Sequence, residues 1–522
     1  MEEKITKIIF VLITLALMNE MSIKVLAKES NKRRFRDKTG GFRKNICDVT
    51  DRESKVHCYC ENSRELKNAT KAECWVFNSG ILKDDVIWQS FASQPALKTL
   101  SFSIRVDGTL NYIPSKALHY LKDLRSLTIR YAAITDITPY AFNNLTNLTE
   151  IILPQNEIET FHQHAFAHLP NLTLINLEDN TITEIGTEVF YDLPELQKII
   201  FTKNNISSIA DGAFQYLYKL LDLFLNRNNI FRMNRHTFDG LANLRKLDLR
   251  QNHIHNLTEF TFAELWNLQE LLLGKNYLKY VSERAFDGLS QLRKLSLDDN
   301  KLVTLPSGLF AGVRGLISLD LRSNELYTLT LDNIKPILDN LKSQNSNLLL
   351  QDNNFVCDCR MKWIHTLRNE TQSQNTILAL DNVTCNMDPT VVSTAYSKMF
   401  HVIEYKRDRH HGISQADDKI NISVSQYINI SERENSHKAK YSDRKSPTKL
   451  PLTRTFFTIP PENLPCPREV TKTTEVPQIV MDPVMPLQNK IKTNRHQEMN
   501  SARSIKIVTI LLFYVPVLCT FV

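Results

Sequence analysis

A fixed period of 24 residues, running from Leu124 to about Leu338, constrains the fold of this chain more than any other feature. Nine consecutive segments share a template close to L-x-x-L-x-L-x-x-N-x-L/I. They begin at Leu124, Leu148, Leu172, Leu196, Leu220, Leu244, Leu268, Leu292 and Leu316. Self-similarity at a fixed period is typical of stacked repeats, whereas a helical bundle would space its apolar residues by about 3.6.

The spacing gives each residue type of the template a physical role. Leucines at positions 4 and 6 alternate as in a strand, so both point to one face. The asparagine at position 9 stands where the chain turns inward, and its amide can satisfy backbone groups of neighbouring coils. These asparagines are Asn156, Asn180, Asn204, Asn228, Asn252, Asn276, Asn300 and Asn324. The pattern predicts an α/β leucine-rich-repeat solenoid, a horseshoe with a parallel sheet on its concave side.

A second apolar anchor near position 19 is expected to fill the convex side of the core. It is Phe142, Phe166, Phe190, Phe214, Phe238, Phe262, Phe286 and Phe310. Degenerate copies at 97–102 and 348–355 extend the array, so we expect about eleven coils within 97–356. Ala132 replaces the asparagine in the Leu124 coil, which predicts a weaker turn there.

The first residues of the chain indicate secretion. Residues 1–27 fit a signal peptide, because Lys4 and Lys7 precede an apolar run and Val25-Leu26-Ala27 offers a cleavage site. The chain would then mature in an oxidising compartment.

A basic arm is expected at 28–46. Its eight Lys and Arg against Glu29 and Asp37 contribute +6 of the formal net charge of +7. Such an arm could bind sulfated glycans, be clipped after Arg34, or be a solvated disordered leader. Nucleic acid is a poor candidate partner for a secreted chain.

Cysteines flank the repeats and indicate two caps, at 47–96 and 357–400. Small cross-linked modules can cover the apolar ends of a solenoid, so we interpret the cysteines as disulfides and not as metal or redox sites. The segment 357–364 resembles the start of the carboxy-terminal flanking domain of extracellular leucine-rich-repeat proteins, in which the tryptophan, here Trp363, packs under the last coil.

The usual pairing in that family implies three disulfides, and the two other cysteines of the ectodomain form an expected fourth. The expected pairs are Cys47 with Cys60, Cys58 with Cys74, Cys357 with Cys385, and Cys359 with Cys466.

Ten N-x-S/T sequons support an extracellular fate. They are Asn68, Asn144, Asn147, Asn171, Asn205, Asn256, Asn369, Asn382, Asn421 and Asn429. Within the regular array none falls on the strand positions, so glycans would leave the concave sheet bare. This sheet is therefore the expected binding surface.

Beyond the second cap, 401–500 reads as a polar stalk. The segment 501–522 has an uncharged apolar run from 507 on and fits a cleaved signal for a glycosylphosphatidylinositol anchor, attached at Asn500 or Ser501. The alternative is a short single-pass helix. The expected location is the outer leaflet of the plasma membrane.

Side chains at positions 3, 5, 7 and 8 should face outward on the sheet. Four large apolar residues occupy position 5, and such exposed groups suggest a contact patch. They are Ile152, Ile200, Phe224 and Leu272. Acidic residues come first along the sheet (Glu150, Glu178 and Asp179), followed by basic ones (Lys198, Lys203, Arg227, Lys246 and Arg250) and then by Asp298 and Asp299. Adjacent blocks of opposite charge could dock on a second copy. The alternative is a solvated face with scattered apolar residues.

Catalysis is not expected from this sequence. His162, His164 and His168 could suggest a metal, but they flank a convex core residue and lack a set of cysteine or carboxylate ligands. The chain shows no P-loop, H-E-x-x-H or G-x-S-x-G motif, and we expect no cofactor.

The order of signal, cap, regular repeats, cap, stalk and anchor signal resembles insect cell-surface leucine-rich-repeat adhesion proteins. The resemblance implies homophilic adhesion between cells, such as neurons and muscles. The partner would be a second copy, or another surface protein, on an opposed cell. A co-receptor that captures a secreted factor for a transmembrane partner is the alternative, and the basic arm is the feature that favours it.

Overall fold

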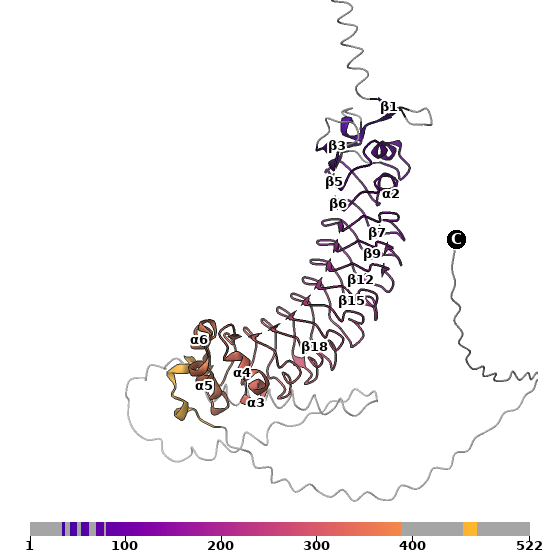
Figure 1. Ribbon diagram of the computed structural model, residues 1–522. Coiled ribbons are helices and arrows are strands. Elements are labelled where there is room, and N and C mark those ends of the chain that lie inside the picture. The colour runs from indigo at the N-terminus through magenta and orange to yellow at the C-terminus, as the bar shows by residue number, and fades with distance from the viewer. Residues whose placement is uncertain are drawn as a thin grey trace, which may run out of the picture. The chain divides into compact units, whose positions relative to one another are not determined.

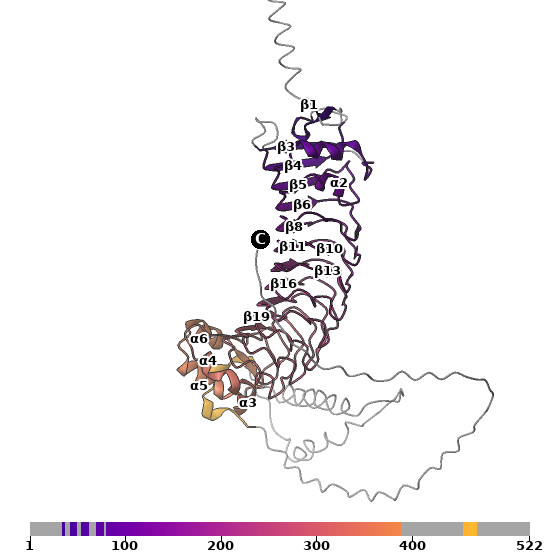
Figure 2. The same ribbon diagram turned by 45° about the vertical axis from the view of Figure 1, so that its right-hand side comes forward.

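One curved solenoid accounts for most of the described chain (Figures 1 and 2). The computed structural model describes residues 34–36, 42–49, 54–61, 69–77, 80–387 and 453–466. The main sheet has 13 strands, and eleven of them, from β5 to β23, are successive parallel strands of the repeats. This agrees with the expected horseshoe of about eleven coils.

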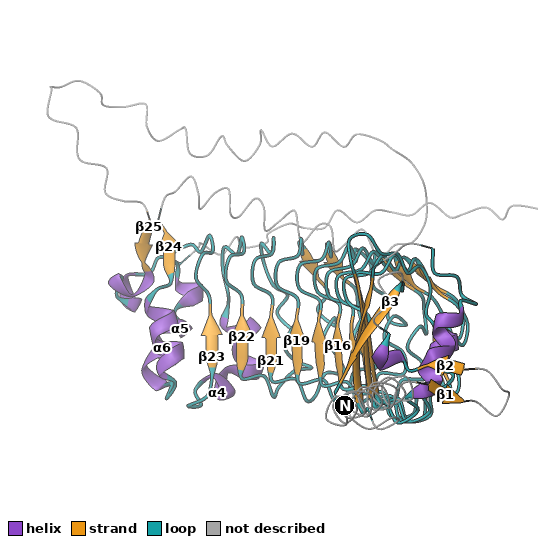
Figure 3. Cartoon of the chain, turned by 90° about the horizontal axis from the view of Figure 1, so that it is seen from above, coloured by secondary structure: helices purple, strands orange, loops and turns teal. Residues whose placement is uncertain are grey.

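The strands of the repeats lie side by side on the concave face, in the order of the sequence (Figure 3). They are β5 (Thr99–Ile104), β6 (Ser126–Arg130), β8 (Glu150–Ile152), β11 (Leu174–Asn176), β14 (Lys198–Ile200), β16 (Asp222–Phe224), β17 (Lys246–Asp248), β19 (Glu270–Leu272), β21 (Lys294–Ser296), β22 (Ser318–Asp320) and β23 (Asn347–Leu349). From β6 to β22 each residue pairs with the one 24 positions later, as Ile199 does with Leu223. The last coil is longer because it contains α3 (Leu331–Ile334) and α4 (Leu338–Leu341).

The asparagine at position 9 joins each coil to the one before it. The Oδ1 atom of Asn180 accepts the N–H of Ile158 at 3.2 Å, and its Nδ2 donates to the carbonyls of Leu153 and Leu177 at 2.9 and 3.0 Å. The same bonds recur at Asn204, Asn228, Asn252, Asn276, Asn300 and Asn324. Each buried amide therefore satisfies backbone groups of two coils. In the Leu124 coil, alanine replaces this asparagine, and the N–H of Ala132 donates to Oδ1 of Asn156 at 2.8 Å.

Aromatic rings fill the convex side of the core, as the repeat predicts. All eight phenylalanines of position 19 are at most 1% exposed. Neighbouring rings stack, with centroids 5.5 Å apart between Phe142 and Phe166 and again between Phe166 and Phe190. Short parallel pairs lie outside the concave sheet, namely β7 (Asp136–Ile137) with β9 (Thr160–Phe161), β10 (Phe166–Ala167) with β13 (Phe190–Tyr191), β12 (Glu184–Ile185) with β15 (Ser208–Ile209), and β18 (Asn256–Leu257) with β20 (Tyr280–Val281).

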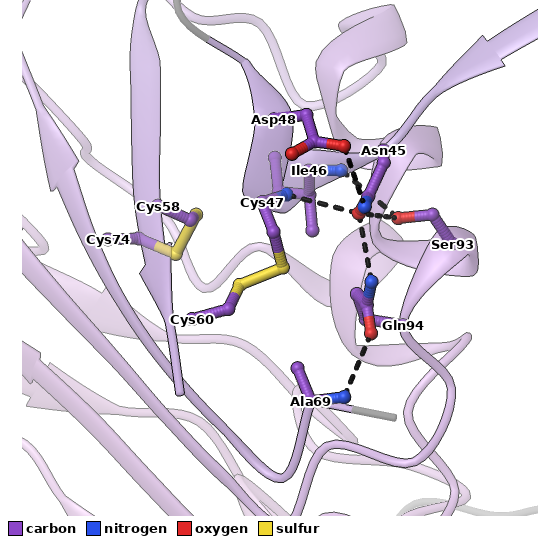
Figure 4. The surroundings of a disulfide bond; sticks show 10 residues. All are labelled: Asn45, Ile46, Cys47, Asp48, Cys58, Cys60, Ala69, Cys74, Ser93 and Gln94. Carbon is purple, nitrogen blue, oxygen red and sulfur yellow. Dashed lines mark hydrogen bonds between the residues drawn. A yellow bond between two sulfur atoms is a disulfide. The ribbon is translucent and has the colours of Figure 1, made fainter. Parts of the chain in front are cut away.

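The N-terminal cap continues the sheet. β4 (Lys71–Val76) pairs in parallel with β5, and β3 (Val56–Cys60) forms an antiparallel edge. The Cys47–Cys60 disulfide joins β3 to the preceding turn, and the Cys58–Cys74 disulfide joins β3 to β4. Asn45 anchors the turn, because its Oδ1 accepts bonds from Ser93 Oγ at 3.0 Å and Gln94 Nε2 at 2.9 Å (Figure 4).

Part of the expected basic arm is ordered. β1 (Arg34–Arg36) pairs antiparallel with β2 (Phe42–Lys44). Ile46 is fully buried and follows Asn45, so the end of the segment predicted as an arm belongs to the cap. A further helix, α2 (Ser115–Leu118), lies in the first coil.

The C-terminal cap contains α5 (Trp363–Glu370), α6 (Gln374–Asp381) and β24 (Thr384–Asn386). The indole nitrogen of Trp363 donates to the carbonyl of Leu329 at 2.7 Å, so this ring packs against the end of the array. The Cys357–Cys385 disulfide closes the cap.

Residues 453–466 belong to this cap and not to the stalk in which the sequence analysis places them. β25 (Thr453–Thr455) pairs antiparallel with β24, and the Cys359–Cys466 disulfide ties the segment to the first turn of the cap. Phe456 is fully buried, with its ring centroid 5.1 Å from that of His365. Burial lowers the pKa of His365. The prediction of a stalk is wrong for these residues because their apolar and disulfide contacts with the cap join positions that are far apart in the sequence.

The predicted signal peptide, Asn500 and Ser501 lie outside the described residues, as does most of the predicted stalk. Within the described part, no helix has the length and apolar character needed to cross a bilayer.

Replacing Asn228 with alanine tests the ladder. Asn228 is 3% exposed and bonds to Ile206, Phe201 and Leu225 at 3.0, 2.9 and 3.0 Å. Asn228→Ala leaves these buried backbone groups unpaired, so we expect a loss of about 3 kcal/mol in the free energy of unfolding. Chemical denaturation measures this loss. Asn229→Ala is the matched control, because Asn229 is exposed and the described residues give its side chain no hydrogen bond. Equal losses in the two variants would contradict this role.

Candidate functional site

The concave sheet carries the candidate site because strand alternation divides its residues between core and surface. In β14, Ile199 is fully buried while Lys198 and Ile200 on either side are half-buried and face outward. The repeat fixes the inward positions and leaves the outward ones free to vary. The predicted contact residues lie at the outward positions of β8 to β19 and in the turns that directly follow these strands.

Three of the four predicted apolar residues remain accessible. Ile152, Ile200 and Phe224 are half-buried, on β8, β14 and β16. Leu272 on β19 is only 5% exposed, so the expectation that it faces solvent is wrong. Its register neighbours Asp248 and Ser296 are 1% and 6% exposed. Hydrogen bonds hold Asp248, Ser296 and their bonding partners close to the sheet. These side chains cover most of Leu272.

Phe224 lies between two ammonium groups. The Nζ atoms of Lys198 and Lys246 are 5.0 and 5.8 Å from the centroid of its ring. Both distances are within the range of a cation–π interaction. The register explains the arrangement, because Lys198 and Lys246 occupy position 3 on the two strands beside β16. The repeat pattern places all three side chains on the outward face but does not predict this contact.

Several predicted charges are neutralised within the chain. Arg250 forms two bonds with Asp248, at 3.0 and 2.6 Å, and these bonds raise the pKa of Arg250. Lys203 pairs with Asp179 at 2.8 Å. A charge that is already paired within the chain gains less free energy when a partner protein binds.

Glu270 is held between two lysines. Its carboxylate lies 2.9 Å from Lys246 and 2.7 Å from Lys294. Burial alone would raise the pKa of Glu270, but the hydrogen bonds with Lys294 and Lys246 lower it below its ordinary value. The carboxylate therefore stays charged at neutral pH and offsets much of the positive charge on this side of Phe224.

Other predicted charges have no ion pair among the described residues. Glu178 is exposed, and Glu150 accepts only a hydrogen bond from Ser126 Oγ, at 2.9 Å. Lys198 contacts the Phe224 ring, and Arg227 Nε donates to the neutral Gln251 at 3.0 Å. These four side chains retain the charge that could meet a partner.

The turn that ends each strand fixes the direction of position 8. Asp179, Lys203 and Arg227 have φ values of 57°, 60° and 58°, in the left-handed region that non-glycine residues rarely adopt. Each directly precedes a ladder asparagine. Backbone hydrogen bonds to the next coil support the conformation, as the 3.0 Å bond from the N–H of Lys203 to the carbonyl of Asn226 shows. Glycine is absent at these positions, so the sequence gives little sign of the turn.

The sequons within the described part leave the concave face clear. Those at Asn144, Asn147, Asn171, Asn205, Asn369 and Asn382 are exposed, and Asn256 is half-buried in β18, outside the main sheet. Asn68, Asn421 and Asn429 lie outside the described residues. Glycosylation at the described sequons would therefore not cover the strands.

The three histidines near Phe166 pair with separate carboxylates. His162, His164 and His168 lie 3.4, 3.8 and 2.7 Å from Asp136, Glu188 and Asp192 respectively. In the described part of the chain, no group of three or more His, Cys, Asp or Glu residues could hold a metal ion.

Models of leucine-rich repeats match the array. A BspA-type leucine rich repeat region matches residues 89–221 in six copies, and a leucine rich repeat model matches 194–254, 242–302 and 290–336. Connectin of Drosophila melanogaster is 38% identical over 112 residues, which are 22% of this chain and 16% of connectin. The match thus spans much less than two thirds of that relative.

Two complexes are among the solved structures to which this chain is similar. A TLR13–ssRNA13 complex has 24% identity and a TM-score of 0.46, covering 53% of this chain and 41% of the other. The Drosophila Toll–Spatzle complex has 19% identity and a TM-score of 0.41, covering 62% and 56% respectively.

Replacing Phe224 with aspartate tests the concave face. Phe224→Asp should abolish partner binding and cost only about 1 kcal/mol of stability, because the ring is half-buried. The measurement is retention of the labelled ectodomain on cells that bind the unchanged chain. Phe231→Asp, at a ring that is 48% exposed outside the strands of the main sheet, is the control. Unaltered binding by Phe224→Asp would exclude this patch.

Proposed function

Since the chain is a leucine-rich-repeat protein similar to connectin, we propose that it is a cell-surface adhesion protein that binds through its concave face. Its mature form is held in the outer leaflet by a glycosylphosphatidylinositol anchor. The preferred partner is a second copy of the chain on an opposed cell. The protein has no enzymatic activity in this proposal and needs no cofactor.

The observation that carries the proposal is the accessible patch of Ile152, Ile200 and Phe224, which lies on a sheet free of described sequons. Half-buried apolar side chains gain free energy when a partner removes them from water, at about 25 cal/mol per Å² of apolar area. Unpaired charges beside the patch add specificity more than affinity. These properties fit recognition of a protein surface.

Lipid anchoring rests on the sequence of the last residues. The uncharged run Ile507–Val522 follows small polar residues near Asn500 and Ser501, which is the order of an anchor signal. An anchor in one leaflet transmits no signal by itself, so the function would be contact between cells or presentation of a bound molecule.

A ligand-capturing co-receptor is the second candidate. The basic segment 28–46 favours it, since eight Lys and Arg could hold sulfated glycans or an acidic secreted factor near the solenoid. In that case binding would require one membrane and not two.

A mixed aggregation assay distinguishes the two functions. Expressing and non-expressing suspension cells carry different labels, and we expect clusters of expressing cells alone. Phosphatidylinositol-specific phospholipase should release the protein and disperse the clusters. Clusters that include non-expressing cells would mean a different surface partner. Absence of clusters would contradict adhesion and favour the co-receptor, and clusters that survive the phospholipase would contradict the lipid anchor.

A further inference from the structure

A disulfide closes a long section of the chain at the C-terminal cap. Cys359 lies in the first turn of the cap, and Cys466 ends the last described segment. The two cysteines are 107 positions apart in the sequence, yet their Cα atoms are 5.0 Å apart. Everything from 360 to 465, including α5, α6, β24 and β25, therefore lies in a covalent loop that begins and ends at one point of the cap.

The proposed lipid anchor would apply tension to this point. When a cell pulls away from a neighbour bound at the concave sheet, tension enters the described chain at Cys466 and leaves it through the strands of the repeats. Two covalent routes join these places. The backbone route runs through 360–465, whereas the disulfide route passes directly from Cys466 to Cys359, a short way after β23. The shorter route becomes taut first, so it carries the tension.

We propose that the Cys359–Cys466 disulfide is a clasp that carries tension between the membrane anchor and the repeats. It keeps 360–465 out of the path of that tension, and its reduction by an external dithiol lengthens the tether. The inference rests on the proposed adhesion of a lipid-anchored protein and adds the point at which the solenoid is held.

Without the clasp, few contacts hold the end segment against a pull. β25 pairs with β24 over three residues, and Thr455, at the end of β25 that leads to Cys466, stands opposite Thr384 (Figure 3). A pull on Cys466 therefore acts on one end of the pair, so its hydrogen bonds break one after another and do not resist together. The apolar contacts that remain are mainly those of Phe456, Ile459 and Leu464, which are at most 6% exposed.

The clasp is also the accessible disulfide of this cap. Cys466 is exposed and Cys359 is half-buried, whereas Cys357 and Cys385 are each 1% exposed. A thiolate of the dithiol can attack Cys466, form a mixed disulfide with it and displace Cys359 as a thiolate. The second thiolate of the reagent then displaces Cys466. The dithiol is thereby oxidised to a disulfide, and its two protons end on the two cysteines.

The two disulfides of the cap predict different gains in length. Loss of the clasp alone frees the chain that follows Cys385, about 80 residues or roughly 280 Å when extended. Loss of both disulfides frees the 107 positions from Cys359 to Cys466, roughly 370 Å. Unfolding of one coil of 24 residues adds only roughly 80 Å. The length of a step therefore identifies which part of the chain has opened.

Stretching single molecules tests the clasp. The full chain carries one bioorthogonal side chain in place of the exposed Lys279 and another in place of Lys490, and magnetic tweezers pull on these two positions. The variant with Cys359→Ser and Cys466→Ser should lengthen by roughly 280 Å before any coil unfolds. The wild type should show this step only after treatment with a dithiol.

The other disulfide of the cap supplies the matched control. The variant with Cys357→Ser and Cys385→Ser also lacks one disulfide but keeps the clasp, so it should show no long step before the coils unfold.

A cut in the backbone route keeps the test independent of how the cysteine variants fold. A protease recognition sequence inserted after Asp417 allows the otherwise unchanged chain to be cleaved between β24 and β25. The cleaved molecule should withstand tension as the uncut one does, because the clasp still joins its two parts. It should separate after a dithiol is added.

Three results would overturn the inference. A long step in the untreated wild type, or separation of the cleaved chain without dithiol, would place the tension on the backbone route. Opening of the serine variant at Cys359 and Cys466 only after the coils unfold would mean that the contacts of 453–466 hold the segment by themselves. None of these results depends on adhesion or on the anchor, whose failure would appear in the aggregation assay instead.

Discussion

The hydrogen bonds of the buried asparagines are the constraint on which the rest of the structure depends. A solenoid must turn its chain inward once per coil, and each turn leaves backbone groups in a core that water cannot reach. Asn228 bonds to the carbonyl of its own coil and to two groups of the preceding coil. This geometry holds the coils in register, and the leucine and phenylalanine columns can stack only in that register.

In this framework the inward residues of each strand provide stability and the outward residues are available for recognition. Ile199 and Leu223 face the core and cannot change without loss of packing, whereas Lys198 and Phe224 beside them face outward. Neighbouring coils can therefore carry different outward residues on identical interiors. On this sheet the outward positions have become a small apolar patch, a lysine–phenylalanine–lysine contact and charges of both signs, some of which have no ion pair among the described residues. The resulting face combines accessible apolar and charged side chains, as protein-binding surfaces do.

The sequence predicts the array well because its signal is local and repeated. The leucines, asparagines and phenylalanines each recur at one position, and the structure places them as the pattern indicates. The disulfides in the structure are also the pairs expected from the family and from the remaining cysteines. The expected Cys359–Cys466 pair places Cys466 at the cap. The packing of residues 453–465 escapes prediction, because these residues follow a long polar segment and only contacts such as that of Phe456 with His365 reveal the association.

The concave face is less predictable than the array. Alternation correctly assigns Leu272 to the outward column, but neighbours tied down by hydrogen bonds bury it. Residue type also does not distinguish Lys203, which pairs with Asp179, from Lys198, which packs against an aromatic ring. These differences depend on side-chain contacts between strands, which a linear pattern does not contain.

A glycan placed on the concave face tests the central claim that this face is the adhesive surface. Ile200→Asn creates a sequon with the native Phe201 and Thr202, and glycosidase treatment reports its occupancy by a shift in gel mobility. Ile200→Gln controls for loss of the apolar side chain, and Phe231→Thr makes a sequon at the exposed Asn229, outside the strands of the main sheet. Our account predicts that the glycan at position 200 abolishes cell clustering while the one at Asn229 does not. Clustering that persists with an occupied glycan at position 200 would contradict it.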